Sequence, residues 1–289
     1  MKLFKRIFTA TVIFLIVISI AGIIYVLRFQ EEPSVTKEPK KETKQIKPIK
    51  PKKATASTKA TSLPVKSAPL REVAIIVDDI GFNLSAVKEL LKINADLTFA
   101  ILPFQAHTRE AAEMCHKAKR ETLLHLPMEP VSYPREKPGE GALFTDMNDE
   151  ELVLQLNKNI ADVPYISGVN NHMGSKFMTD EKKLILIFNE LKKKKLFFVD
   201  SRTSVDTNAY AAAKKTGLRI AERKIFIDNN RDYNKIYANL INIAKDKDVS
   251  PQIIIGHPYP ETIRALKEAT KALREKGISI VPVSEIINQ

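Results

Sequence analysis

A repeated strand–helix pattern from Val73 onward constrains the fold of this chain more than any other feature. Eight short apolar runs predict strands, and seven longer segments between them have the periodicity and start signals of helices. The predicted strands are 73–77, 97–102, 122–126, 166–170, 196–199, 225–227, 253–255 and 280–283. Repeated βα units of this length predict an α/β fold with a parallel sheet and outer helices, and seven or eight strands favour a barrel over a doubly wound sheet.

The N-terminal 70 residues differ from the rest in composition. Residues 7–27 form an uncharged run of 21, long enough to cross a bilayer, so 1–29 is predicted to be a signal anchor. Lys2, Lys5 and Arg6 before it favour export of the following chain to the periplasm or cell surface. The alternative is a signal peptide cleaved after Ser19-Ile20-Ala21, which would release a secreted protein. The Lys/Pro-rich residues 30–70 predict a disordered linker, which leaves 71–289 as the catalytic domain.

The charge distribution argues against nucleic acid as a partner of the folded part. The net charge is +12, yet residues 1–70 hold 14 Lys and Arg against 4 Glu, whereas 71–289 hold 32 basic against 30 acidic residues. The domain is therefore nearly neutral, and the chain has no Trp for base stacking. Cys115 is the only cysteine, which excludes an intramolecular disulfide and a zinc site built on several cysteines.

The first predicted strand ends in two adjacent carboxylates, Asp78 and Asp79. Like charges this close repel each other, which raises one pKa unless a cation lies between them. Regular alternation along the strand would turn one carboxylate toward an ion and leave the other beside it, free to act as a base. The alternative is a polar turn in which an Asp caps the next helix.

Four other predicted strands also end in residues capable of chemistry. These are His125, Asn170-Asn171-His172, Asp200-Ser201-Arg202 and His257. Because the carboxyl ends of parallel strands form the active face of such folds, these groups are expected to meet there. Asp and His are the ligands of zinc or a harder divalent ion when cysteine is absent. The remaining histidines, His107 and His116, fall at the start of and within a predicted helix, and are interpreted as surface or capping residues.

Several of these residues have two interpretations. Glu129, four residues after His125, is either a second ligand at the same turn or a surface carboxylate. His172 is either functional or a satisfied structural histidine, and Asp200 with Arg202 either orients a neighbour or forms a structural ion pair. The Pro/Gly-rich segment 130–145 predicts a loop or flap over one end of the sheet.

The order of the motifs V-D-D-I-G, L-H-L-P-M-E-P, N-N-H-M-G-S, F-V-D-S-R-T and G-H-P-Y-P-E-T resembles the divergent polysaccharide deacetylases, distant relatives of the NodB-type carbohydrate esterases. The resemblance covers 71–289. It implies a distorted, incomplete (β/α) barrel of the NodB type. It also implies a hydrolase that uses a divalent metal, zinc above all, to remove acetyl groups from a cell-envelope polysaccharide.

The resemblance also implies roles for individual residues. Asp78 resembles the general base and His257 the catalytic acid. Asp79, His125 and His172 resemble the metal ligands, with Glu129 as the alternative third ligand because it stands where typical members have a second His.

Four further residues are predicted to bind or orient the acetylated glycan: Asn171, Ser175, Asp200 and Arg202. Two other functions remain open. One is an inactive glycan-binding or scaffold protein, and the other is a phosphoesterase or amidase that uses the same metal.

Overall fold

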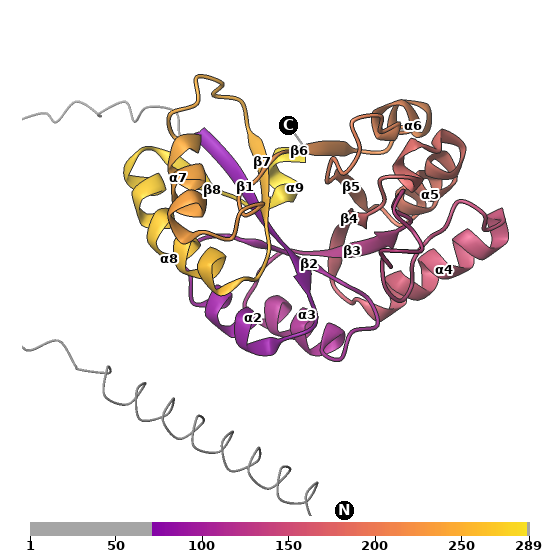
Figure 1. Ribbon diagram of the computed structural model, residues 1–289, viewed down its shortest axis with the longest axis horizontal. Helices are drawn as coiled ribbons and strands as arrows, with labels where there is room; N and C mark the ends of the chain where they lie inside the picture. Colours follow the sequence, from indigo (N-terminus) through magenta and orange to yellow (C-terminus); the bar gives the residue numbers. More distant parts are fainter. Residues whose placement is uncertain (1–70, 288–289) are drawn as a thin grey trace, which may run out of the picture. The chain divides into compact units, whose positions relative to one another are not determined.

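Parallel strand pairing organises the fold of residues 71–287, the part of the chain that the computed structural model describes (Figure 1). β1 pairs with both β2 and β7, which closes seven strands into a barrel in the order β1 to β7. The eighth strand, β8, pairs only with the first residues of β1, Arg71 to Val73. The strands are β1 (Arg71–Ile80), β2 (Thr98–Ile101), β3 (Thr122–Met128), β4 (Ile166–Met173), β5 (Phe197–Asp200), β6 (Ile220–Phe226), β7 (Gln252–Gly256) and β8 (Ile278–Ile280).

The main helices lie outside this ring of strands (Figure 1). Several start where the sequence signals placed them: Asn148 and Glu151 form a capping box at α4, and the Asp180 side chain caps α5. The helices are α2 (Leu84–Leu91), α3 (Thr108–Lys117), α4 (Asp149–Asp162), α5 (Glu181–Lys193), α6 (Ala209–Thr216), α7 (Tyr233–Ile243), α8 (Pro260–Glu275) and α9 (Val283–Ile287), with a 3-10 turn, η1, at Phe177–Thr179.

The core has two layers because side chains alternate across the barrel wall. One set, which includes Val73, Ile75 and Val77, packs outward against the helices. The other set includes Ala74, Ile76 and Phe197 and fills the barrel interior. Gly168 on β4 makes room for the Phe197 ring, since a Cβ there would lie 2.3 Å from a ring carbon.

The short helix α9 closes the barrel at the N-terminal ends of the strands. Val283 belongs to the interior core, and its N–H donates to the Thr98 hydroxyl. The Ser284 N–H donates to the Glu121 carboxylate, which immediately precedes β3. Because this end is plugged, the opposite end of the barrel, where the strands finish, is the one available for a site.

The α/β barrel predicted from the sequence is confirmed, and it has seven of the seven or eight strands expected. The resemblance implied an incomplete barrel, but the pairing of β1 with both β2 and β7 closes the ring. Two predicted strands are misplaced. β6 begins at Ile220, whereas the predicted strand began at Ile225. The first half of β6 was missed because it carries charged residues such as Arg223 and has no apolar run. The last strand ends at Ile280, and Val283 begins a helix instead.

The predicted anchor at 1–29 and linker at 30–70 lie outside the described residues. Within 71–287, no helix combines the length and apolar character needed to span a membrane.

Candidate functional site

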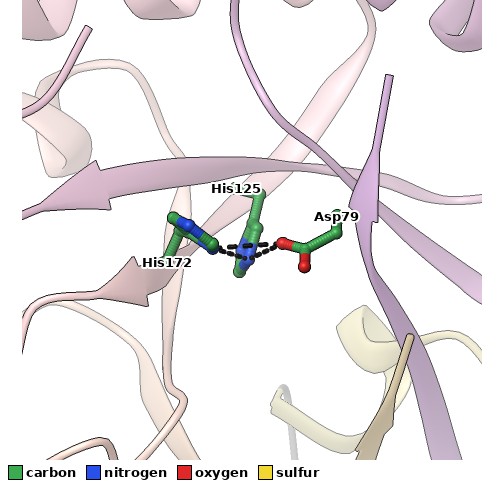
Figure 2. A group of neighbouring side chains, drawn as sticks. All are labelled: Asp79, His125 and His172. Carbon is green, nitrogen blue, oxygen red and sulfur yellow. Dashed lines mark hydrogen bonds and ion pairs between the residues drawn. The ribbon is translucent and has the colours of Figure 1, made fainter. Parts of the chain in front are cut away.

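Three metal-ligating side chains converge at the open end of the barrel. Figure 2 shows Asp79, His125 and His172 pointing toward one another; they come from the last residues of β1, the middle of β3 and the last residues of β4. Asp79 Oδ1 lies 3.2 Å from His125 Nε2 and 3.1 Å from His172 Nδ1, and the two ring nitrogens are 3.1 Å apart. His125 is buried, whereas Asp79 and His172 keep 28 % and 24 % of their side-chain surface exposed, so solvent reaches the group from one side.

A β-bulge places both aspartates on this side of the strand. Val77 of β1 pairs with Phe99 of β2, and the next pair is Ile80 with Ile101. β1 therefore advances by three residues where β2 advances by two, which is a β-bulge. Asp79 lies within the bulge and has a φ of 57°, a left-handed conformation that Asp tolerates better than most residues. The regular alternation expected for Asp78 and Asp79 is therefore absent, and both carboxylates approach His125.

The donor set fits a divalent cation. Asp79 Oδ1 is buried and makes no hydrogen bond of acceptable geometry, even though two imidazoles lie within 3.2 Å of it. Ligands bound to zinc at 2.0–2.1 Å in a tetrahedral arrangement lie about 3.3 Å from one another, close to the separations between these three atoms. One carboxylate and two imidazoles with an open side also match a catalytic site that keeps one position for water. A metal would supply the partner that Oδ1 lacks.

The electrostatics favour a cation at the same place. Burial alone raises the pKa of Asp79, but the adjacent imidazoles of His125 and His172 outweigh it and hold that pKa below its usual range. Burial opposes a charge on His125, yet the nearby carboxylates of Asp78 and Asp79 raise the pKa of its imidazole overall. Asp78 is the opposite case: burial raises its pKa, with Asp79 adding to the effect, while His125 and His257 counteract it in part. A carboxylate with a raised pKa is suited to accept protons.

Asn170 connects two of these groups. Its Oδ1 lies 2.9 Å from His125 Nδ1, and its amide nitrogen donates to Asp78 Oδ1 at 2.8 Å. Because an amide oxygen only accepts, Nδ1 of His125 carries a proton, and Nε2 is the ring nitrogen that faces Asp79 and His172 and is available to a metal. Asn170 thus fixes the His125 tautomer that a metal requires.

His257 is held by a carboxylate that the sequence analysis did not select, Asp228. The Nδ1 of His257 lies 2.9 Å from Asp228 Oδ1, and Asp228 Oδ2 accepts from the His257 backbone N–H and the Thr262 hydroxyl. Val77 pairs with Gly256, which brings the end of β7 beside Asp78. Burial lowers the pKa of His257, but the hydrogen bond and charge of Asp228, with Asp78 and Asp79, raise it overall.

Glu129 does not join the metal donors. Its Oε1 accepts from Lys176 Nζ at 2.8 Å, and its Oε2 accepts from the Thr145 N–H and hydroxyl at 2.8 and 2.6 Å. Both oxygens are therefore used in holding the 130–145 segment to the chain that follows β4. Between the two alternatives for the third ligand, the geometry favours His172.

The four predicted glycan-binding residues lie in different settings. The Asn171 side-chain oxygen accepts from the Ser201 N–H, and its amide nitrogen donates to the Met173 carbonyl and the Thr203 hydroxyl. Asn171 therefore connects the end of β4 to the segment that follows β5. Asp200 is buried, which raises its pKa, and its Oδ1 accepts a hydrogen bond from the backbone N–H of Arg202. The Arg202 guanidinium lies 3.6 Å from the Glu222 carboxylate. Within 71–287, no hydrogen bond or ion pair joins the side chains of these three residues to the metal donors. Ser175 lies on the rim, where its hydroxyl accepts from the Val131 N–H.

The residues that the sequence analysis missed carried a usable signal. Asp228 directly follows the predicted strand 225–227, so it satisfies the same strand-end criterion as Asp78 and His125. Asn170 ends another predicted strand, but its neighbour Asn171 was selected instead. Side chains alternate along a strand, and the contacts of Asn170 show that it is the member of the pair that faces the site.

Comparisons with known proteins agree with this architecture. A model of a family described as "Divergent polysaccharide deacetylase" matches residues 75–287. An uncharacterized protein of Escherichia coli K12, YibQ, is 33 % identical over 234 residues, which cover 80 % of this chain and 70 % of that protein. An uncharacterized protein of Haemophilus influenzae is 32 % identical over 209 residues, 71 % of this chain and 72 % of that protein.

A solved structure shares the fold. It is the crystal structure of an uncharacterized protein of Agrobacterium tumefaciens C58, with a TM-score of 0.71 at 22 % identity. The match covers 77 % of this chain and 92 % of that one. At 22 % identity the likeness supports the shared barrel fold. The chemistry of the site depends on the residues that this chain places there.

Proposed function

Because this chain belongs to the divergent polysaccharide deacetylase family, we propose that it is a metal-dependent hydrolase that removes acetyl groups from a cell-envelope polysaccharide. One observation carries the proposal: the convergence of Asp79, His125 and His172 beside a buried carboxylate, Asp78. The same barrel mouth holds a carboxylate-paired histidine, His257. A base, an acid and a metal-donor set are the parts that hydrolysis of an amide or ester requires.

Asp79, His125 and His172 would hold the metal, with zinc as the proposed ion. When bound, such an ion would polarise the acetyl carbonyl and lower the pKa of water toward about 7. Asn170 occupies Oδ1 of Asp78 and fixes the carboxylate. Oδ2 is therefore the oxygen that takes a proton from the attacking water.

His257 supports the opposite proton transfer. Its Nδ1–H is donated to Asp228, so Nε2 is the nitrogen that presents a proton to the leaving amine or alcohol. The rings of Phe226 and Tyr259 stack at 5.7 and 5.4 Å from the imidazole and fix its orientation. The base and the acid thus stand at the ends of adjacent strands, β1 and β7.

Metal binding by the purified full-length chain tests the proposal. The wild type, stripped with chelator and reloaded with Zn²⁺, is expected to retain about one ion per chain and to release acetate from acetylated oligosaccharides or an aryl acetate. Asp79→Asn is expected to weaken metal affinity by more than the 10–100-fold typical of losing a supporting hydrogen bond, because it removes a ligand. Elemental analysis and an acetate assay provide the readouts.

A matched substitution far from the site is the control. Asp149→Asn changes an exposed carboxylate in the first turn of α4 and is expected to leave metal content and activity intact. An Asp79→Asn protein with full metal content would refute the assignment of the ligands. Wild-type protein that binds glycan but holds no metal and releases no acetate would establish the scaffold function instead.

We also propose that residues 1–29 anchor the protein with its catalytic domain outside the cytoplasm, on the strength of the uncharged run 7–27 and its basic flank. Protease added to intact spheroplasts is then expected to digest the domain. Protection of the domain until the membrane is lysed would contradict this location.

A further inference from the structure

A pocket lies where the chain after β3 meets the chain after β4. It is an open cavity of about 670 Å³ lined by Val131, Ser132, Pro134, Arg135 and Ser175. Four of these residues belong to the 130–145 segment after β3, called the flap below, and Ser175 follows the end of β4. The pocket therefore lies between the flap and the strand that supplies His172.

One wall of the pocket belongs to the same turn as a metal donor. Ser175 follows His172 by three residues, and the turn between them uses left-handed backbone at Met173 and Gly174, with φ of 52° and 87°. Gly174 is required there, because a Cβ would lie 2.9 Å from the Cβ of Met128. The Val131 N–H donates to Ser175 Oγ at 3.0 Å, which joins the two walls of the pocket.

Glu129 makes the flap a fixed wall. The buried carboxylate of Glu129 bridges Thr145, at the far end of the flap, and Lys176, just beyond Ser175. Its backbone N–H donates to the Leu143 carbonyl, and its own carbonyl accepts from the Lys176 N–H at 3.1 Å. Both ends of the flap are therefore tied to the barrel, so the pocket is a built feature that can hold a ligand in one register.

The positive charge among the residues that line the pocket comes from a single side chain. Arg135 is the one charged side chain among its lining residues, and within 71–287 its guanidinium makes no ion pair. Lys176, which follows Ser175, is paired with Glu129. The Glu136 carboxylate accepts a hydrogen bond from the Ser132 hydroxyl of the pocket wall and keeps its negative charge, so Arg135 is the group that would attract an anion. An exposed guanidinium without a partner offers a planar set of donors that matches a carboxylate or a phosphate.

The pocket also offers surface for a sugar ring. The Val131 side chain in its wall is 72 % exposed. Tyr133 lies in the chain between the lining residues Ser132 and Pro134, and its ring, 43 % exposed, is supported by Phe144 at 4.9 Å. Apolar and aromatic groups beside hydroxyl and guanidinium donors are the mixture that a sugar with an anionic substituent requires.

We propose that this pocket is a substrate subsite that binds an anionic substituent, a carboxylate or phosphate, on the glycan, and that Arg135 determines the preference for it. This proposal rests on the proposed function, since it places the acetyl group at the metal donors and the anionic group in the adjacent pocket. It makes the substrate an acidic glycan.

The test compares three acetylated oligosaccharides of equal length: a neutral one, one with a carboxylate and one with a phosphate. For the full-length wild type, kcat/KM is expected to be higher on at least one anionic substrate than on the neutral one. Arg135→Gln is expected to raise KM for that substrate about tenfold or more, the range for a lost hydrogen bond between charged groups, with kcat and the neutral substrate unchanged. The anionic substrate whose KM rises most in Arg135→Gln identifies the substituent, carboxylate or phosphate, that the pocket binds.

Lys137→Gln is the matched control, because it removes a neighbouring exposed cation that does not line the pocket. Equal effects of Lys137→Gln and Arg135→Gln, or an equal loss on neutral and anionic substrates, would overturn the proposal. Calorimetric titration of the same oligosaccharides separates it from the proposed function. If no substrate is hydrolysed, the proposed function fails, and weaker binding of the anionic glycan by Arg135→Gln alone still supports the subsite.

Discussion

Replacing Asp78 by Asn is expected to lower kcat for acetate release by about 10²–10⁴-fold while the protein keeps its metal. The side chain is buried, and Asn170 fixes one of its oxygens, so an amide of almost the same shape fits the site. An amide cannot accept a proton at neutral pH, and the activation of water is lost. Because Asp78 is outside the group Asp79, His125 and His172, metal content is expected to stay at the wild-type level.

The acid side of the pH profile provides a second readout for Asp78. The base must be ionised, so activity falls as pH decreases through its pKa. Burial and the neighbouring Asp79 raise this pKa above the usual value for Asp, so the acidic limb of the wild-type profile is expected above that value. If Asp78→Asn lost metal as completely as Asp79→Asn, Asp78 would be a ligand instead of a base.

Replacing His257 by Gln is expected to lower kcat by about 10²–10⁴-fold on an N-acetylated sugar and far less on an aryl acetate. An amine leaves only when it is protonated, whereas an aryl oxide is stable enough to leave without an acid. The ratio of the two activities therefore reports the loss of a proton donor separately from any general damage to the site. An equal loss on both substrates would indicate that His257 is structural.

Asp228→Asn tests how the acid is tuned. His257 must be protonated to act, so activity falls as pH rises through its pKa. Burial disfavours the imidazolium, while Asp228, with Asp78 and Asp79, stabilises it and raises the pKa. Removing the Asp228 charge is therefore expected to shift the alkaline limb of the profile to lower pH. An alkaline limb that stays in place would show that Asp228 acts only on geometry, through the His257 and Thr262 contacts.

Much of the fold and of the metal group could be predicted because both depend on patterns that are local in sequence. The strand–helix alternation predicted a parallel barrel, and its strand ends carried Asp78, Asp79, His125, His172 and His257. All five lie at the mouth of the barrel. Parallel strands force this result, since their carboxyl ends meet at one face whatever the details of packing.

The choice between adjacent polar residues depended on tertiary structure. Asn170 and Asn171 are chemically identical, and the pairing of β4 with β3 decides that Asn170 meets His125. Side chains alternate with a period of two, so a shift of one residue exchanges the face that each side chain occupies. Asp200 was selected because it ends a predicted strand, yet it accepts from the backbone N–H of Arg202, and Asp228 is the carboxylate that contacts His257.

The sequence alone therefore determined the barrel, the face that carries the site and the residue types gathered there, because strand periodicity and chain direction are encoded within a few neighbouring residues. Only the tertiary structure decided which of these polar side chains contact one another. The bulge at Asp79 turned two adjacent carboxylates to the same side, and Lys176 with Thr145 drew Glu129 away from the metal donors. Each of these outcomes depends on contacts between segments far apart in the chain, where pairing and close packing select one geometry among several that the local sequence allows.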